Sequence, residues 1–193
     1  MTQQLRRARD RAERERRIVA AARELAEAEG WDAVTTRRLA AKIEYSQPVL
    51  YSHFSGKDAI MAAAAVEGCA ELAEQLGGAA FEPSPLAAVA EAYVAFADAN
   101  PALYDAMFTL ASELPFATDE APQALRDAFG AIAAAVAPVA GKDAVGTLAE
   151  TFWAALHGLV TLDRGRRLSP GHRAERLAIL VARFGGGASG PAD

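Results

Sequence analysis

With 193 residues, 52% of them apolar and 7% aromatic, the chain can bury a core for one medium domain or for a small domain joined to a larger one. Its net charge of −5 alone argues against a nucleic-acid partner, but residues 1–58 hold 12 Lys and Arg against 9 Asp and Glu, whereas residues 59–193 hold 8 against 16. A basic front on an acidic remainder is what a DNA-binding head joined to a non-DNA-binding body requires.

The composition also excludes several classes of protein. Cys69 is the single cysteine, so no internal disulfide can form and no thiolate pair is available for a metal. The N-terminus is densely charged and lacks the apolar region of a signal peptide. The longest apolar stretch, residues 131–140, is about half a membrane span and contains a proline. Alanine carries much of the apolar content. We therefore expect a soluble, cytoplasmic, all-α protein with no cofactor and no membrane partner.

The N-terminal segment, residues 1–15, is expected to be a basic arm, either a solvated helix start or an arm that contacts phosphates. Residues 1–17 contain seven arginines interleaved with three acidic residues. From residue 16 to 29, the apolar side chains Ile18, Ala21, Ala22 and Leu25 recur at helical spacing and predict a helix that ends before Gly30.

Two short helices are predicted next, at residues 35–43 and 46–53. Thr35 and Ser46 are suitable N-caps, and Pro48 is tolerated in a first helical turn. Together with the helix before them they predict a helix-turn-helix domain over residues 16–58. With Leu50 and Phe54 as its anchors, the third helix is expected to turn Gln47, Tyr51 and His53 outward, and Gln is suited to an adenine edge.

The remainder, residues 59–185, is predicted to be a helical bundle for ligand binding and dimerisation. A helix from about residue 55 to 75 is expected to stop before Gly77 and Gly78, and residues 186–193 are expected to form a flexible tail. The further predicted helices span residues 85–99, about 101–110, 123–137, 143–162 and 173–184. No segment shows the alternation of a strand, so about nine helices are expected in total.

Residues 35–58, TTRRLAAKIEYSQPVLYSHFSGKD, resemble the DNA-binding domain of TetR/AcrR-type transcriptional repressors. The most specific parts are T-T-R-x-L-A, Q-P-x-L-Y-x-H and the lysine that follows. A second stretch, FWAALHGLV at residues 152–160, is similar to the C-terminal regulatory domain of the WHG-type branch of that family. The two departures are Glu44, where the family usually has glycine, and Tyr45, where it has a small apolar residue.

The resemblance implies a role for individual residues in DNA binding. Arg37 would reach a guanine edge, Gln47 would read an adenine, and Pro48 and Tyr51 would touch bases or thymine methyl groups. Phosphate contacts are implied for Thr36, Tyr51, His53 and Lys57. Tyr51 could instead be a core residue and His53 a helix end-cap. The full predicted set is Thr35, Thr36, Arg37, Tyr45, Ser46, Gln47, Pro48, Tyr51, His53 and Lys57.

Aromatic and methionine side chains cluster in the middle of the body and could line an apolar ligand pocket or simply form the core. The candidates are Tyr93, Phe96, Tyr104, Met107, Phe108, Phe116, Trp153 and His157. His157 could equally be a core residue. A basic clamp for an anionic ligand is lacking, because residues 79–163 contain only Arg126 and Lys142, so a neutral or mildly cationic ligand is expected.

Two further patterns predict a homodimer. One predicted helix has a face of small residues, Thr147, Thr151, Ala154 and Gly158, and the last helix carries the apolar stripe Leu177, Leu180, Val181 and Phe184. No E-x-x-H, G-x-S-x-G, Walker A or C-x-x-C motif occurs. The sequence thus predicts a ligand-responsive repressor that binds double-stranded DNA. The alternatives are an all-helical enzyme and a constitutive DNA- or partner-binding module.

Overall fold

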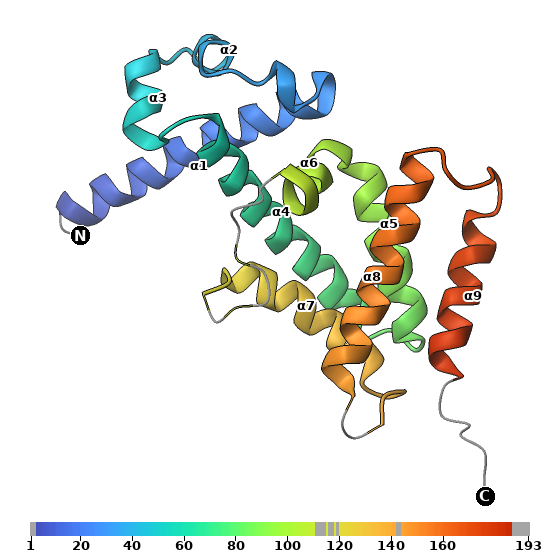
Figure 1. Ribbon diagram of the computed structural model, residues 1–193. Coiled ribbons are helices and arrows are strands. Elements are labelled where there is room, and N and C mark those ends of the chain that lie inside the picture. The colour runs from blue at the N-terminus through green and yellow to red at the C-terminus, as the bar shows by residue number, and fades with distance from the viewer. Residues whose placement is uncertain (1–2, 111–114, 116–117, 119, 142–143, 187–193) are drawn as a thin grey trace, which may run out of the picture. The chain divides into compact units, whose positions relative to one another are not determined.

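A computed structural model describes residues 3–110, 115, 118, 120–141 and 144–186. Within these residues the secondary structure is helical: nine α-helices, one short 3-10 segment and one π-helical turn (Figure 1). The all-α prediction is therefore confirmed. The chain divides into two compact units. The first combines the N-terminal segment up to Gly68 with residues 100–121, and the second combines residues 69–99 with the segment after Ala121.

The first unit begins with a long helix and continues with three short elements. These are α1 (Gln3–Glu29), η1 (Trp31–Ala33), α2 (Thr36–Lys42) and α3 (Gln47–His53), and the start of α4 (Lys57–Ala79) follows. Their core is formed by side chains at most 1% exposed, namely Ile18, Ala22, Val34, Leu39, Leu50 and Ile60. Thr35 caps α2 as expected, because its hydroxyl accepts a hydrogen bond from the Arg38 backbone N–H at 3.2 Å.

The first unit also contains α6 (Pro101–Asp105) and the π-helical turn η2 (Ala106–Leu110), which together span the single helix expected at 101–110. The Glu27 carboxylate accepts hydrogen bonds from the backbone N–H groups of Ala102 and Leu103, at 3.0 and 2.9 Å. The Trp31 indole donates to the Ala102 carbonyl at 2.7 Å. Gly68 gives the segment room, since a Cβ there would lie 2.8 Å from Met107 Sδ. The start of α6 is thus held by α1 and η1.

The second unit is built around α5 (Pro85–Ala99). This helix packs against α7 (Gln123–Val136), α8 (Val145–Arg164) and α9 (Arg173–Gly185). Tyr93, Phe96, Phe152 and Leu156 are at most 1% exposed and form the centre of its core. Helix α9 contributes no buried residue. An ion-pair network attaches its start, because Arg173 pairs with both Asp98 and Asp163, and the Phe184 ring packs 5.0 Å from that of Phe152 near its end.

Most helix boundaries lie within two residues of those expected, and two differ by more. Helix α1 begins at Gln3, not at residue 16, because ion pairs one turn apart, such as Arg11 with Glu15 at 2.8 Å, support helix without a core. The stop expected at Gly77 and Gly78 is wrong, since α4 continues to Ala79. Leu76, which is fully buried, holds that turn against the glycine cost of about 1 kcal/mol each. None of the described helices is long and apolar enough to cross a membrane.

Candidate DNA-binding site

The turn between α2 and α3 sets the seating of α3. Its second residue, Glu44, has a φ of +58°, a left-handed conformation that favours glycine. The backbone N–H of Tyr45 reaches back to the Ala40 carbonyl at 2.9 Å, which closes the C-terminal end of α2. The chain therefore makes the same type of turn that a glycine would allow, with a glutamate in the strained position.

Helix α3 presents a mixed polar and apolar surface to solvent. Leu50 is 1% exposed and anchors the helix to the core. Gln47, Pro48 and Tyr51 are exposed as expected, and Tyr51 is 54% exposed, so it is not a core residue. Val49 is 38% exposed and was not among the predicted residues. An apolar residue beside a glutamine suits a surface that meets both polar base edges and thymine methyl groups.

Helix α2 carries two arginines, one ion-paired and one not ion-paired among the described residues. The Arg38 guanidinium makes a paired contact with the Glu29 carboxylate, at 2.7 and 2.9 Å, and this pairing raises the pKa of Arg38 and lowers that of Glu29. Arg37 is exposed and forms no ion pair within the described part of the chain. The Thr36 hydroxyl lies 3.4 Å from that of Tyr51. Arg37 is therefore the arginine of α2 that remains available for a ligand.

The two ends of α3 are fixed to α1. In the turn just before it, Tyr45 accepts a hydrogen bond from Arg17 at 3.3 Å, and the same guanidinium lies 5.4 Å from the centre of the Tyr45 ring. At its end, His53 Nδ1 lies 3.3 Å from Glu15 Oε1, and the His53 side chain is only 5% exposed. The outward orientation expected for His53 is therefore wrong, because the ring is taken up by the contact with α1.

The remaining predicted residues lie at helix starts near this surface. Thr35 and Ser46 are exposed and precede α2 and α3, where backbone N–H groups are free. Lys57 is the first residue of α4 and its ammonium group lies 4.0 Å from Asp32. Hydroxyls and a lysine beside helix N-termini are suited to phosphate groups.

The predicted ligand residues are distributed over both units. In the second unit, the Trp153 indole donates to the Tyr93 hydroxyl at 3.0 Å, and the His157 ring lies 6.5 Å from that of Trp153. Burial lowers the pKa of His157, which favours the neutral form of its imidazole. Phe96 is buried in the same unit, whereas Tyr104, Met107 and Phe108 belong to the first. Phe116 lies outside the described residues.

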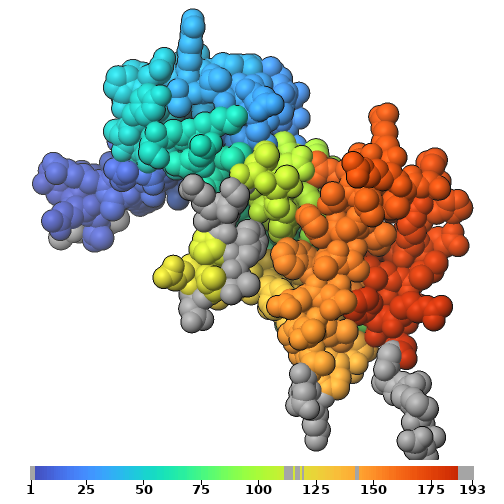
Figure 2. All heavy atoms as spheres, viewed as in Figure 1, coloured from blue at the N-terminus to red at the C-terminus, as the bar shows by residue number. Residues whose placement is uncertain are grey.

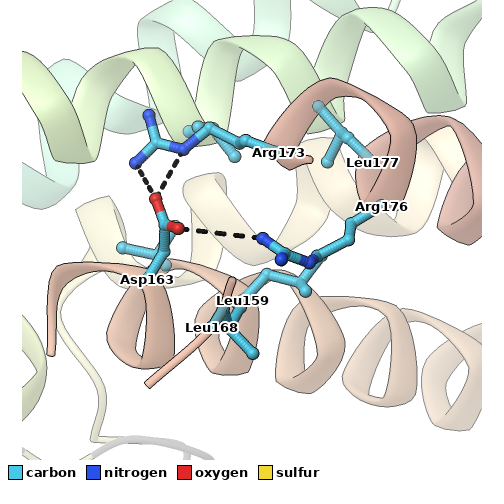
Figure 3. Close-up of a pocket in the computed structure, with 8 residues that line it drawn as sticks. Leu159, Asp163, Leu168, Arg173, Arg176 and Leu177 are labelled. Atoms are coloured by element: carbon cyan, nitrogen blue, oxygen red, sulfur yellow. Dashed lines mark hydrogen bonds and ion pairs between the residues drawn. The ribbon is translucent and has the colours of Figure 1, made fainter. Parts of the chain in front are cut away.

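A small cleft of the second unit lies where α5, α8 and α9 meet (Figure 3). Asp163 lies in it between Arg173 and Arg176, with one carboxylate oxygen 2.7 Å from Arg173 and the other 3.8 Å from Arg176. The rest of the lining is mostly aliphatic and includes Leu159 and Leu177. None of the predicted ligand residues lines this cleft, and its only carboxylate is already neutralised by two arginines.

The residues predicted for dimerisation form two groups, one on α8 and one on α9. Thr147, Thr151 and Ala154 are exposed, and Gly158 is half-buried with open space at the position of a Cβ. The stripe on α9, formed by Leu177, Leu180, Val181 and Phe184, is half-buried throughout. Ile179 on the same helix is 54% exposed.

Comparison with known proteins agrees with these features. Residues 18–64 match the model of "Bacterial regulatory proteins, tetR family", and residues 86–184 match that of "Tetracyclin repressor-like, C-terminal domain". The uncharacterized HTH-type transcriptional regulator YobS of Bacillus subtilis is 39% identical over 92 residues, which are 46% of this chain. The chain spans about half of that relative, 48% of its length.

Two solved structures from Rhodococcus sp. RHA1 share the fold. One, a protein with unknown function, has 26% identity and a TM-score of 0.72 over 90% of this chain and 94% of its own. The other, a bacterial regulatory protein in the tetR family, has 21% identity and a TM-score of 0.59 over 89% and 96%.

The short helix pair with an anchored, solvent-facing second helix is a helix-turn-helix, here joined to a helical unit of its own. The class of protein is therefore a helix-turn-helix transcription regulator. Because the two family models together match residues 18–64 and 86–184, the chain belongs to the TetR family.

Proposed function

We propose that the protein is a homodimeric repressor that binds a pseudo-palindromic DNA operator and is released from it by a small, mostly apolar molecule. The observation that carries the proposal is the exposed surface of α3, where Gln47, Pro48, Val49 and Tyr51 surround a fully anchored Leu50. Helix α3 would enter the major groove, with Gln47 on an adenine and Arg37 on a guanine.

Phosphate contacts would fix the register of that helix. Thr36 and Tyr51 place their hydroxyl groups together, and Lys57 and the helix starts at Thr35 and Ser46 offer further donors. Tyr45 is held by Arg17 at the edge of the same surface. His53 contributes indirectly in this proposal, because it fastens the end of α3 to Glu15.

Dimerisation is proposed through α8 and α9. Helix α9 has no buried residue although it carries four apolar side chains in one stripe, so a second copy would complete its burial. Small residues at Thr151, Ala154 and Gly158 would let the two α8 helices approach closely. A two-fold axis through this interface would present two α3 helices to successive half-sites.

The effector would act by favouring one of two conformations. A small ligand that contacts Trp153, Tyr93 and His157 would shift the equilibrium only by its difference in affinity for the two conformations. Helix α4 is shared by both units, and α6 is hydrogen-bonded to α1 through Glu27. These two helices would therefore pass a change in the body to the DNA-binding domain.

The first experiment selects operator sequences from a random duplex library with the full-length protein. Enrichment of a pseudo-palindrome supports the proposal, and enrichment of no sequence overturns it. If about six phosphates are neutralised, affinity for the selected site should fall about 10³-fold between 50 and 200 mM salt.

The second experiment tests the effector site. A screen of neutral, lipophilic compounds for release of the protein from its operator is repeated with Trp153→Ala. Sensitivity should fall by a factor that reflects up to a few kcal/mol of lost contact, with operator affinity nearly unchanged. Equal sensitivity of wild type and variant would place the effector elsewhere and leave a core role for Trp153. A constitutive binding module would respond to no compound.

A further inference from the structure

The first fifteen described residues of α1 form a helical arm outside the packed core. The first buried side chain of α1 is Ile18, and residues 3–14 are all exposed. Figure 2 shows this N-terminal stretch, in dark blue, projecting from the rest of its unit. Residues 3–17 hold seven arginines against Asp10, Glu13 and Glu15, which is a strongly basic surface on a protein whose net charge is −5.

The arginines of the arm are ordered by the helical repeat. Positions 7, 11 and 14 continue the spacing of the buried positions 18, 22 and 25, so Arg7, Arg11 and Arg14 lie on the face of α1 that packs into the core further along. None of the three acidic residues falls in this row. We refer to Arg7, Arg11 and Arg14 as the arginine row.

Helix α3 lies over this same face of α1. The turn before α3 contacts Arg17 through Tyr45, and the last residue of α3, His53, contacts Glu15. These two α1 residues lie on either side of the line that runs through the arginine row. Figure 1 shows α1 extending past α3 toward its N-terminus. The arginine row therefore points to the side of α1 on which the recognition helix lies.

Other partners fit this arm less well than DNA. An interfacial membrane helix needs a broad apolar face, and residues 3–17 offer only Leu5, Ala8 and Ala12. A packed protein helix would need a similar apolar stripe. Three arginines at one-turn spacing on one exposed face match the regular phosphates of a duplex, and Arg11 would exchange its surface ion pair with Glu15 for a phosphate. Arg7 lies about 16 Å before Ile18 along the helix axis, a length of about five base pairs.

We propose that the arginine row binds the phosphate backbone of the duplex just outside each operator half-site, and so extends the contact beyond the helix-turn-helix. The inference rests on the proposed operator binding. It requires no base-specific contact, because guanidinium groups on an exposed helix bind phosphates without reading sequence. The arm would raise affinity and salt dependence while leaving sequence preference to α3.

The test compares two triple variants of the full-length protein that remove the same charge. Arg7→Gln, Arg11→Gln and Arg14→Gln removes the row, and Arg6→Gln, Arg9→Gln and Arg16→Gln removes arginines from the opposite face. Each is titrated at several salt concentrations against two duplexes, one trimmed to the operator and one extended by about ten base pairs on each side, which covers the reach of the arm. Circular dichroism confirms that both variants keep the helical content of the wild type.

We expect the row variant to lose affinity for the extended duplex by at least tenfold more than the opposite-face variant. Its log–log salt slope should fall by about 0.9 for each phosphate contact removed, and the difference should vanish on the trimmed duplex. Equal losses in the two variants, or a row effect that is the same on both duplexes, would overturn the proposal. These outcomes differ from failure of operator binding itself, in which wild type would prefer no sequence on either duplex.

Discussion

At the scale of single residues, the left-handed backbone conformation of Glu44 destabilises the folded state locally. Its φ of +58° brings the Cβ close to the following carbonyl, a conformation that costs a non-glycine residue roughly 1–2 kcal/mol. The turn is kept because Leu39 and Leu50 are buried on either side of it and Tyr45 is held by Arg17. Packing of the two short helices thus outweighs the backbone preference of one residue.

Replacing Glu44 by glycine is expected to stabilise the folded protein. Glu44→Gly should raise the free energy of unfolding by about 1 kcal/mol, because glycine adopts positive φ without a steric penalty. Glu44→Ala serves as the control, since alanine keeps the Cβ and removes only the charge. Chemical denaturation of the three proteins measures the effect. Equal stability of the glycine and alanine variants would show that the turn is not strained.

At the scale of elements, the attachment of α6 to α1 has two parts. Glu27 satisfies two N–H groups that a helix start leaves without an intrahelical acceptor, and Trp31 holds the Ala102 carbonyl. Neither residue was expected to have this role, because Glu27 and Ala102 are separated by 75 positions and the pairing depends on tertiary structure. The apolar character of Trp31 explains its burial, but nothing near it in the sequence indicates that its indole donates to Ala102.

Removing this carboxylate should loosen α6. Glu27→Ala should lower the free energy of unfolding by about 1–2 kcal/mol, as the loss of a helix cap does. Glu27→Gln retains one acceptor oxygen and should lose less. Hydrogen exchange at the amides of Ala102 and Leu103 reports the same contact directly. Unchanged exchange in the alanine variant would mean that Glu27 does not cap α6 in solution.

A second prediction at the scale of elements concerns the proposed homodimer, whose interface includes α9. Leu180→Glu should convert the proposed dimer to a monomer, because it places a charge in an apolar interface without a partner. Ala182→Glu is the matched control, since Ala182 is exposed and lies away from the stripe. Sedimentation at micromolar concentration separates the two outcomes. A monomeric wild type would contradict the proposed interface before either variant is made.

At the scale of the whole molecule, local patterns predicted much of the fold. The helix expected at 85–99 has those bounds. The helix expected at 35–43 differs from the observed one by one residue at each end, and that at 173–184 by one residue at its end, because capping residues and apolar spacing mark their limits. The helix over residues 3–15 was expected only as one of two alternatives, because charge pairs, not apolar residues, support it. The inward turn of His53 was missed because it depends on Glu15, which lies 38 positions earlier.

The division into units is also a property of the whole chain. The DNA-binding domain was expected to end at residue 58. The first compact unit of the structure extends to Gly68 and also includes residues 100–121. The reason is the close packing of Leu103 and Met107 on the small Gly68, together with the capping of α6 by Glu27. Sequence patterns find helices from near neighbours and carry no signal for a partner that returns thirty or more residues later.

A binding titration of Gln47→Ala tests most directly whether α3 reads DNA sequence. On the selected operator the variant should lose about 1–3 kcal/mol, and it should bind equally well when the contacted base pair is exchanged, because the amide that distinguished the two is gone. Lys57→Ala should weaken binding to all sequences alike and reduce the salt slope by about 1. If Gln47→Ala keeps the full preference of the wild type while Lys57→Ala alters it, α3 does not read the operator as proposed.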